Sequence, residues 1–114
     1  MSEPRLSPRF EIGALIRRAE VGGGFAAVLH RGDDQAGTLL LLTTQRGGNP
    51  RLWERMPGLD DTRRWTELTI QGLESNDDFS QYLARRHAQD PDLWVIELDV
   101  ADPERFIAES GTAV

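Results

Sequence analysis

The segment from Ser75 to Glu109 constrains the fold more than any other part of this chain. Its pattern is typical of a helix that Pro91 stops, a strand over Leu93–Val100, and a short last helix that Asp102 caps. The first half of the strand is apolar on both of its sides, as expected for a strand inside a sheet. The segment therefore indicates an α+β domain built around that strand.

The N-terminal part of the chain predicts a first long helix. Ser7 can cap it, Pro8 can open it, and Gly22 begins the run of three glycines that ends it. Apolar residues repeat at helical spacing along a face that we expect to be buried: Ile12, Leu15, Ile16 and Ala19. Gly13 and Ala14 lie on another side, where their small size would let a neighbouring helix or a second subunit approach closely.

Four further segments carry strand patterns separated by turn residues: Phe25–Arg31, Gly37–Thr44, Arg51–Met56 and Trp65–Ile70. The first two flank the turn Gly32–Gln35 and are predicted to form a hairpin. All four are expected to form an antiparallel meander, joined by the strand Leu93–Val100. The expected fold is α+β, with the two main helices and the short C-terminal helix packed on one face of the sheet.

Composition and charge exclude several classes of protein. We expect a single globular domain over residues 1–114, with an ordered core from about residue 6 to 110. The chain has no cysteine for disulfides or thiolate zinc sites, and no lysine for Schiff-base chemistry or a Walker loop. It has no apolar run near the ~20 residues of a membrane helix and no signal-peptide pattern, which predicts a cytoplasmic protein without membrane contact. A net charge of −6 argues against nucleic acid as a partner.

Several stretches of the chain carry a family resemblance. They are Ala14–Arg18, Gly23–Val28, His30–Asp33 and Asp90–Leu98, the last being the most specific. With them, the chain resembles a small bacterial domain family of unknown function, found mainly in alphaproteobacteria, over about Arg5 to Glu109. The resemblance implies a single domain. It implies no activity, cofactor or catalytic residue.

Arg86 is the charged residue that most needs a partner, because it shares a helical stripe with Phe79 and Tyr82. An internal ion pair is the preferred interpretation, with Glu97 and Asp99 as candidate partners on the strand that follows. The alternatives are a solvent-seeking head group, or a site for a small anion such as a phosphate or carboxylate. In the anion-binding alternative, Arg17 or Arg18 would assist Arg86.

Four acidic residues on strands could converge on one sheet face: Glu54, Glu67, Glu97 and Asp99. Converging carboxylates can bind Mg²⁺ or divide acid and base roles, which would suit a metal-dependent hydrolase. Arginines flank Glu54 at positions 51 and 55, so cross-strand Arg–Glu pairing is the simpler explanation. His30 and His87 are too few for a histidine metal site and are assigned structural or surface roles.

The tryptophans complete the set of candidate contact residues. Trp94 has apolar neighbours and is assigned to the core, whereas Trp53 and Trp65 lie on polar strands and could be core residues or partner anchors. Our first functional hypothesis is a non-enzymatic interaction module without a cofactor. It would contact another protein, or a second copy in a homodimer, through Gly13 and Ala14 or through Trp53 and Trp65. The anion binder and the metal-dependent hydrolase remain as alternatives.

Overall fold

The computed structural model describes residues 7–35, 37–57 and 63–111 of the chain. Eight elements follow one another: α1 (Pro8–Val21), β1 (Phe25–His30), β2 (Leu39–Gln45), β3 (Gly48–Pro57), β4 (Arg63–Leu68), α2 (Asn76–Gln89), β5 (Trp94–Asp99) and α3 (Pro103–Gly111). Residue 6, the predicted start of the ordered core, lies outside the described ranges. Within those ranges, no helix combines the length and the apolar character needed to cross a membrane.

The strands form one sheet in the order β1-β5-β2-β3-β4. β2 and β5 run parallel, and the other neighbouring pairs run antiparallel. The α+β prediction is therefore confirmed, and β2, β3 and β4 form an antiparallel meander as expected. The predicted position of the C-terminal strand inside the sheet is also confirmed, because β5 has a neighbour on each side.

The predicted hairpin between the first two strands is wrong, because β5 lies between β1 and β2. Ile96 of β5 faces Val28 of β1 on one side and Leu41 of β2 on the other. The turn residues favour a hairpin locally, but Leu39–Leu42 are at most 7% exposed and line both faces of β2. A strand that is apolar on both faces belongs in the sheet interior beside another such strand, which β5 supplies and the exposed β1 does not.

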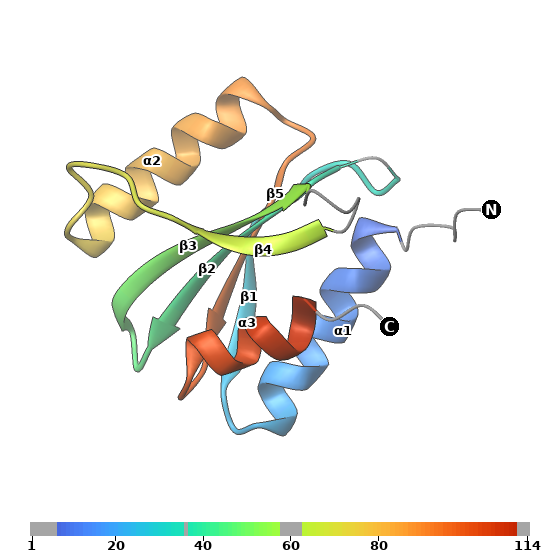
Figure 1. Cartoon of the computed structure of the whole chain (residues 1–114). Helices are drawn as coiled ribbons and strands as arrows, with labels where there is room; N and C mark the ends of the chain where they lie inside the picture. The colour runs from blue at the N-terminus through green and yellow to red at the C-terminus, as the bar shows by residue number, and fades with distance from the viewer. Residues whose placement is uncertain (1–6, 36, 58–62, 112–114) are drawn as a thin grey trace.

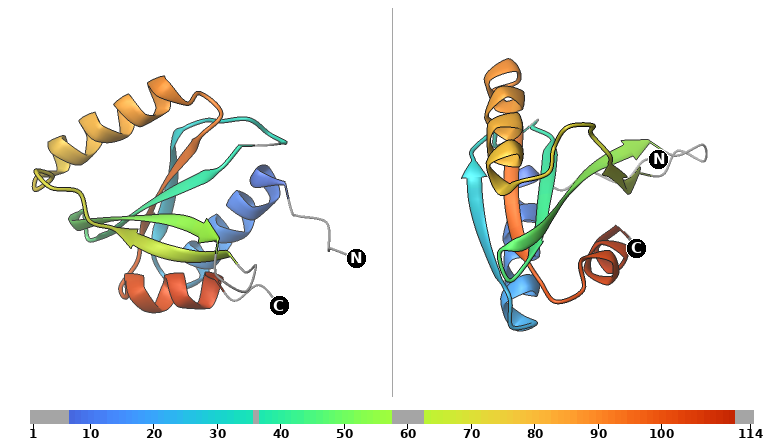
Figure 2. Two further views of the ribbon diagram at one scale, coloured as in Figure 1. Left: turned by 45° about the horizontal axis from the view of Figure 1, so that its top comes forward. Right: turned by 90° about the vertical axis from the view of Figure 1, so that its left-hand side faces the viewer.

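Helices lie on both faces of the sheet rather than on one face as predicted (Figure 1). Figure 2 shows α1 and α3 on one side of the strands and α2 on the other. Because side chains alternate along a strand, the interior strands contribute to two separate cores. The core under α1 and α3 includes Leu15, Leu41, Ile96 and Ile107. The core under α2 includes Leu40, Val95 and Leu83. One covered face could not bury both sets of leucines.

Both long helices begin at serine caps, and the cap at Ser7 is the predicted one. The Ser7 side chain accepts a hydrogen bond from the Phe10 amide, and Ser75 and Asp78 form a reciprocal capping box. After α1, Gly23 has a φ of +88°, a left-handed conformation that glycine adopts without steric cost. The short turn that follows leads directly into β1, so α1 and β1 run in opposite directions.

The two-sided burial of β5 yields a stability prediction. Ile96 is 0% exposed. Replacing it with alanine should lower the free energy of unfolding by about 2–5 kcal/mol, since the cavity cannot collapse between two helix layers. Val28→Ala, at the facing position of β1, should cost clearly less because that side chain is 45% exposed. Urea unfolding measures both losses, and equal losses would contradict the interior position of β5.

Candidate functional site

The four strand carboxylates do not converge. Glu54 faces α2, whereas Glu67 lies on the opposite face of the sheet, near α3. Glu97 and Asp99 lie together on the α2 side of β5, where both accept hydrogen bonds from the Thr44 hydroxyl, at 3.2 and 2.7 Å. Within the described ranges, no group of three His, Asp or Glu side chains is arranged to hold a metal ion. The structure therefore contradicts the convergence of all four carboxylates that the hydrolase alternative would require.

Asp99 is the acceptor that holds the β2–β3 turn. Its carboxylate accepts hydrogen bonds from the Gly47 amide at 2.8 Å and the Arg46 amide at 3.1 Å, in addition to the Thr44 hydroxyl. Burial alone would raise the pKa of Asp99, but these three donors together lower it. Arg46 and Gly47 both have positive φ angles, so the carboxylate stabilises a turn that few residues adopt easily. This role is structural.

Arg86 has an internal acidic partner, but the partner is Glu54 on β3 rather than Glu97 or Asp99. Its Nη2 lies 2.9 Å from Glu54 Oε1, and its Nη1 donates to the Tyr82 hydroxyl at 3.0 Å. Burial opposes the charged form of Arg86, yet the hydrogen bonds to Glu54 and Tyr82 leave its pKa raised. The guanidinium is therefore engaged within the fold, at a place where α2 crosses β3.

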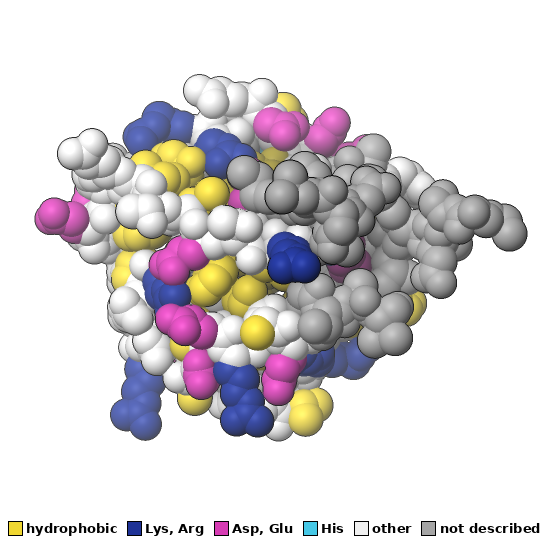
Figure 3. All heavy atoms as spheres, viewed as in Figure 1, with side chains coloured by type: hydrophobic (Ala, Val, Ile, Leu, Met, Phe, Trp, Pro, Cys, Tyr) yellow, Lys and Arg dark blue, Asp and Glu magenta, His cyan; other side chains and the backbone are white. Residues whose placement is uncertain are grey.

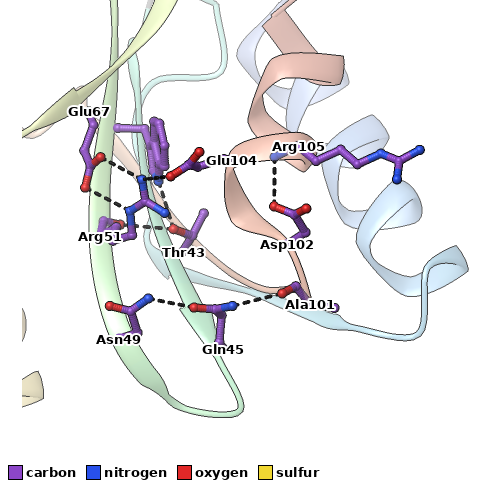
Figure 4. A network of polar contacts seen from close by, with 10 residues as sticks. Thr43, Gln45, Asn49, Arg51, Glu67, Ala101, Asp102, Glu104 and Arg105 are labelled. Carbon is purple, nitrogen blue, oxygen red and sulfur yellow. Dashed lines mark hydrogen bonds and ion pairs between the residues drawn. The ribbon is translucent and has the colours of Figure 1, made fainter.

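Two more arginines, both on β3, connect the sheet to α1 and α3 on the face opposite to α2. Arg51 contacts Glu67 of β4 at 2.7 Å and Glu104 of α3 at 3.1 Å (Figure 4). The hydrogen bond from Arg51 lowers the pKa of Glu67. Arg55 contacts both carboxylate oxygens of Glu11 in α1, at 2.7 and 2.9 Å. The bidentate contact with Glu11 fixes α1 relative to β3, and the single contact with Glu104 connects α3 to the same strand.

The same arginines cover the two candidate anchor tryptophans. Arg51 lies 4.8 Å above the Trp53 ring, and Arg55 lies 4.8 Å above the Trp65 ring. Trp53 is buried and donates to the Thr43 hydroxyl at 2.8 Å, while Trp65 is half-buried. Both line a shallow hollow beside α3, where hydrophobic side chains are visible next to acidic and basic ones (Figure 3). The tryptophans thus serve mainly as core residues and arginine platforms.

The arginines of the anion-binding alternative are not brought together. Arg18 contacts Ser110 and Glu109 of α3, and its guanidinium lies 4.5 Å above the Phe106 ring. Arg17 is exposed on α1, and Arg86 lies across the sheet on α2. More broadly, every buried side-chain nitrogen and oxygen in the described part of the chain has a hydrogen-bond partner. No described buried group is left for a ligand to satisfy.

The predicted contact residues of α1, Gly13 and Ala14, are half-buried and border open space on the outside of the helix. A Cβ atom built on Gly13 would meet no heavy atom within 4 Å. Ala14 lines a second shallow hollow on the outside of the helix, together with Arg17, Arg18, Val21 and Gly22. Val21, at the end of this surface, is 89% exposed. The outside of α1 is therefore available for contact at the positions that the sequence indicated.

The two histidines stack on each other and join β1 to α2. The ring centroids of His30 and His87 are 4.8 Å apart with an interplanar angle of 24°. The His87 Nε2 atom lies 2.8 Å from the Arg31 carbonyl oxygen. Burial, and then the charge of His87, lower the pKa of His30. The stacked rings therefore connect β1 with α2 through two half-buried side chains.

The open edge of β1 is the feature that the sequence analysis missed. Among the described strands, β1 has a neighbour only on its β5 side. Its six residues, Phe25–His30, include no Asp, Glu, Arg or Lys, and Phe25, Val28 and Leu29 are 51%, 45% and 40% exposed. The opposite edge strand, β4, carries two arginines and a glutamate. Charged residues protect edge strands from pairing with other chains, so the two edges differ in kind.

Together these features define a small α+β domain with a mixed five-stranded sheet between helices and an unprotected edge. The chain matches a family model described as "Protein of unknown function (DUF1491)" over residues 6–108, and it belongs to this family. This confirms the resemblance that the sequence motifs carry. A comparison with curated proteins found no match.

Solved structures of the family share the fold. A crystal structure of a DUF1491 protein from Caulobacter crescentus CB15 aligns with a TM-score of 0.77 at 36% identity, covering 90% of this chain and 94% of that one. An NMR structure from the same organism aligns with a TM-score of 0.75 at 35% identity, covering 92% and 94%. The solution structure of Atu0922 from A. tumefaciens aligns with a TM-score of 0.71 at 30% identity, covering 91% and 93%.

The Arg86–Glu54 pair should be energetically coupled. Arg86→Met leaves a half-buried carboxylate without its charged donor, so the free energy of unfolding should fall by about 1–3 kcal/mol. Adding Glu54→Gln should cost less than the sum of the two single losses. Arg105→Met is the matched control, because Arg105 forms an exposed ion pair with Glu109 and should change stability by less than about 0.5 kcal/mol. Strictly additive losses would show that the pair is not coupled.

The lowered pKa of His30 predicts a pH dependence of stability. Near its ordinary pKa of 6.5, the unfolded chain binds a proton at this site more readily than the folded protein does. This contribution to stability is therefore complete above that pH and is lost as the pH falls below it. Unfolding measured between pH 8 and pH 5 should show a steeper loss for the wild type than for His30→Gln. Identical pH slopes would remove His30 as the cause.

Proposed function

We propose that this protein is a non-enzymatic interaction module that receives an extended segment of a partner polypeptide along the open edge of β1. One observation carries the proposal, which is the contrast between the two edges of the same sheet. β4 carries two arginines and a glutamate, and such charges usually protect an edge strand from pairing with another chain. β1 has no acidic residue, arginine or lysine over its six residues. A cytoplasmic location, which the cysteine-free composition supports, is part of the proposal.

An added strand would gain both specificity and affinity from this edge. The unpaired backbone groups of β1 can bond a sixth strand, as in other cases of strand addition. Phe25 faces the α2 side of the sheet and Val28 the α1 side, since each points with its partner on β5. An extended partner would therefore meet exposed apolar side chains on both faces. The register shift between Val28 and His30 places the regular part of the edge at Phe25–Val28.

The internal pairing of the polar side chains supports interaction over catalysis. Arg86, Glu54, Glu67 and Asp99 each have hydrogen-bond partners from neighbouring elements. An anion binder or a metal-dependent hydrolase would need such groups to converge on a cavity. The acidic net charge of −6 also supports a polypeptide partner over a nucleic acid.

A random dodecapeptide library displayed on phage can test strand addition without a known partner. Selection against the immobilised full chain should enrich peptides, and synthetic copies of them should shift the amide NMR signals of β1 and β5. Val28→Lys should reduce their affinity at least tenfold, because a lysine on an edge strand disfavours pairing. Thr66→Lys is the matched control, since Thr66 is exposed on the other edge strand, and it should leave the affinity unchanged.

Two outcomes of this selection would refute the proposal. One is a library that yields no binding peptide for the wild type at a concentration where the wild type is a monomer. The other is a set of peptides that bind equally to the wild type and to Val28→Lys, or that shift signals away from β1. Thermal unfolding of both lysine variants confirms that each is folded before the affinities are compared.

A further inference from the structure

We infer that the polypeptide paired with β1 is a second copy of this chain, related by a twofold axis perpendicular to the sheet. This rests on the proposed function, because it names the occupant of the same edge. In such a pair the two β1 strands run antiparallel and the sheets join. The axis keeps both α1 helices on one face, so α1 of one copy packs antiparallel against α1 of the other.

One side of α1 faces the direction of the open edge. Glu11 and Arg18 contact β3 and α3, respectively, and so mark the side of α1 that is turned toward the rest of the domain. The opposite side carries Arg9, Gly13, Ile16 and Glu20, at helical spacings of four, three and four residues. Ile16 lies at the border of this side, where it packs partly against the core and remains half-buried. We call these four residues the α1 flank. The α1 flank is turned away from β3 and α3, toward the end of the strand order where β1 is the edge strand.

The distances between elements allow both contacts at once. α1 contacts β1 and β5 and lies over these two strands (Figure 2). Neighbouring strands are about 4.8 Å apart, so a twofold axis beside β1 would lie about 5 Å from the axis of α1. The two α1 helices would then be about 10 Å apart, within the range of packed helices. The midpoints of α1 and β1 lie near one another, because the elements run in opposite directions from a short turn.

The α1 flank is complementary to itself in the antiparallel orientation. With the twofold axis between Gly13 and Ile16, Arg9 faces Glu20 of the copy and Gly13 faces Ile16 of the copy. Two ion pairs and two apolar contacts then form by symmetry. Within one copy, Arg9 approaches an acidic group only loosely, at 4.0 Å from Asp34, and Glu20 is exposed. The space around Gly13 is open to receive a side chain.

Pairing the two β1 strands brings no like charges together. Facing residues of paired strands point to the same side of the sheet. The twofold axis also keeps each side chain on its own side of the sheet. One residue of β1 must therefore face the same residue of the second copy, and the axis passes between the two. Ala26 and Ala27 occupy the centre of the regular part of β1 and are small enough for that place. β1 contains no Asp, Glu, Arg or Lys, so like charges do not meet whether the axis passes beside Ala26 or beside Ala27. A second copy thus satisfies the strand edge and the α1 flank together.

Sedimentation equilibrium of the full chain over a wide concentration range tests the inference. The wild type should be a dimer that dissociates on dilution. Arg9→Glu and Glu20→Arg should each raise the dissociation constant at least tenfold, because each places two like-charged pairs at the interface. The double variant Arg9→Glu/Glu20→Arg should return it to within about threefold of the wild type, since the exchanged charges pair again.

Three controls make the result specific. Asp34→Asn removes the weak contact of Arg9 within one copy and should leave the dissociation constant unchanged. Gly13→Leu should fold normally, because the position is open, but it should weaken the dimer by steric conflict with Ile16 of the copy. Val28→Lys should abolish the dimer, and Thr66→Lys should not.

The possible failures are distinguishable. A strictly monomeric mass at every concentration would overturn the second copy as the occupant. If selected peptides still bound β1, the interaction module would stand, and if none did, both would fall. A dimer that is insensitive to Arg9→Glu, Glu20→Arg and Val28→Lys would also overturn the inference, because it would form through another surface.

Discussion

The structure depends on the parallel pairing of β2 with β5. Both strands are apolar on both faces, with Leu41 and Ile96 turned to one core and Leu40 and Val95 to the other. Burying both faces requires a helix layer on each side, so α1 and α3 go to one side and α2 goes to the other. Because β5 takes the place beside β2, β1 is left at the edge of the sheet with β5 as its neighbour. The unprotected strand is therefore a consequence of how the core is built.

The polar side chains then connect the layers that the core separates. Arg86 ties α2 to β3 through Glu54, and Arg55 ties α1 to β3 through Glu11. Arg51 does the same for α3 and places its guanidinium over Trp53. In each case a planar guanidinium makes hydrogen bonds at its edge and an aromatic contact at its face, which a lysine could not do equally well. A chain whose basic residues are all arginine suits this architecture.

Local features of this fold could be predicted from the sequence, and its long-range pairings could not. The helix cap at Ser7 follows from short-range chemistry, as does the interior character of β5. The β1–β2 hairpin was wrong because turn residues report only on the local chain, whereas β5 enters from more than fifty residues away. For the same reason Arg86 was paired with the wrong acids, since its partner Glu54 is set by strand order. The open edge of β1 became visible only once that order was known.

The insertion of β5 between β1 and β2 also bears on how the chain is made. During synthesis on a ribosome, β1 and β2 emerge long before the strand that joins them. Until residues 94–99 are available, β1 has no partner, and β2 has only β3. The leucine-rich β2 therefore lacks its β5 neighbour until residues 94–99 have been synthesised. Contacts of such long sequence separation slow folding, so the step that brings β5 between β1 and β2 is expected to limit the folding rate.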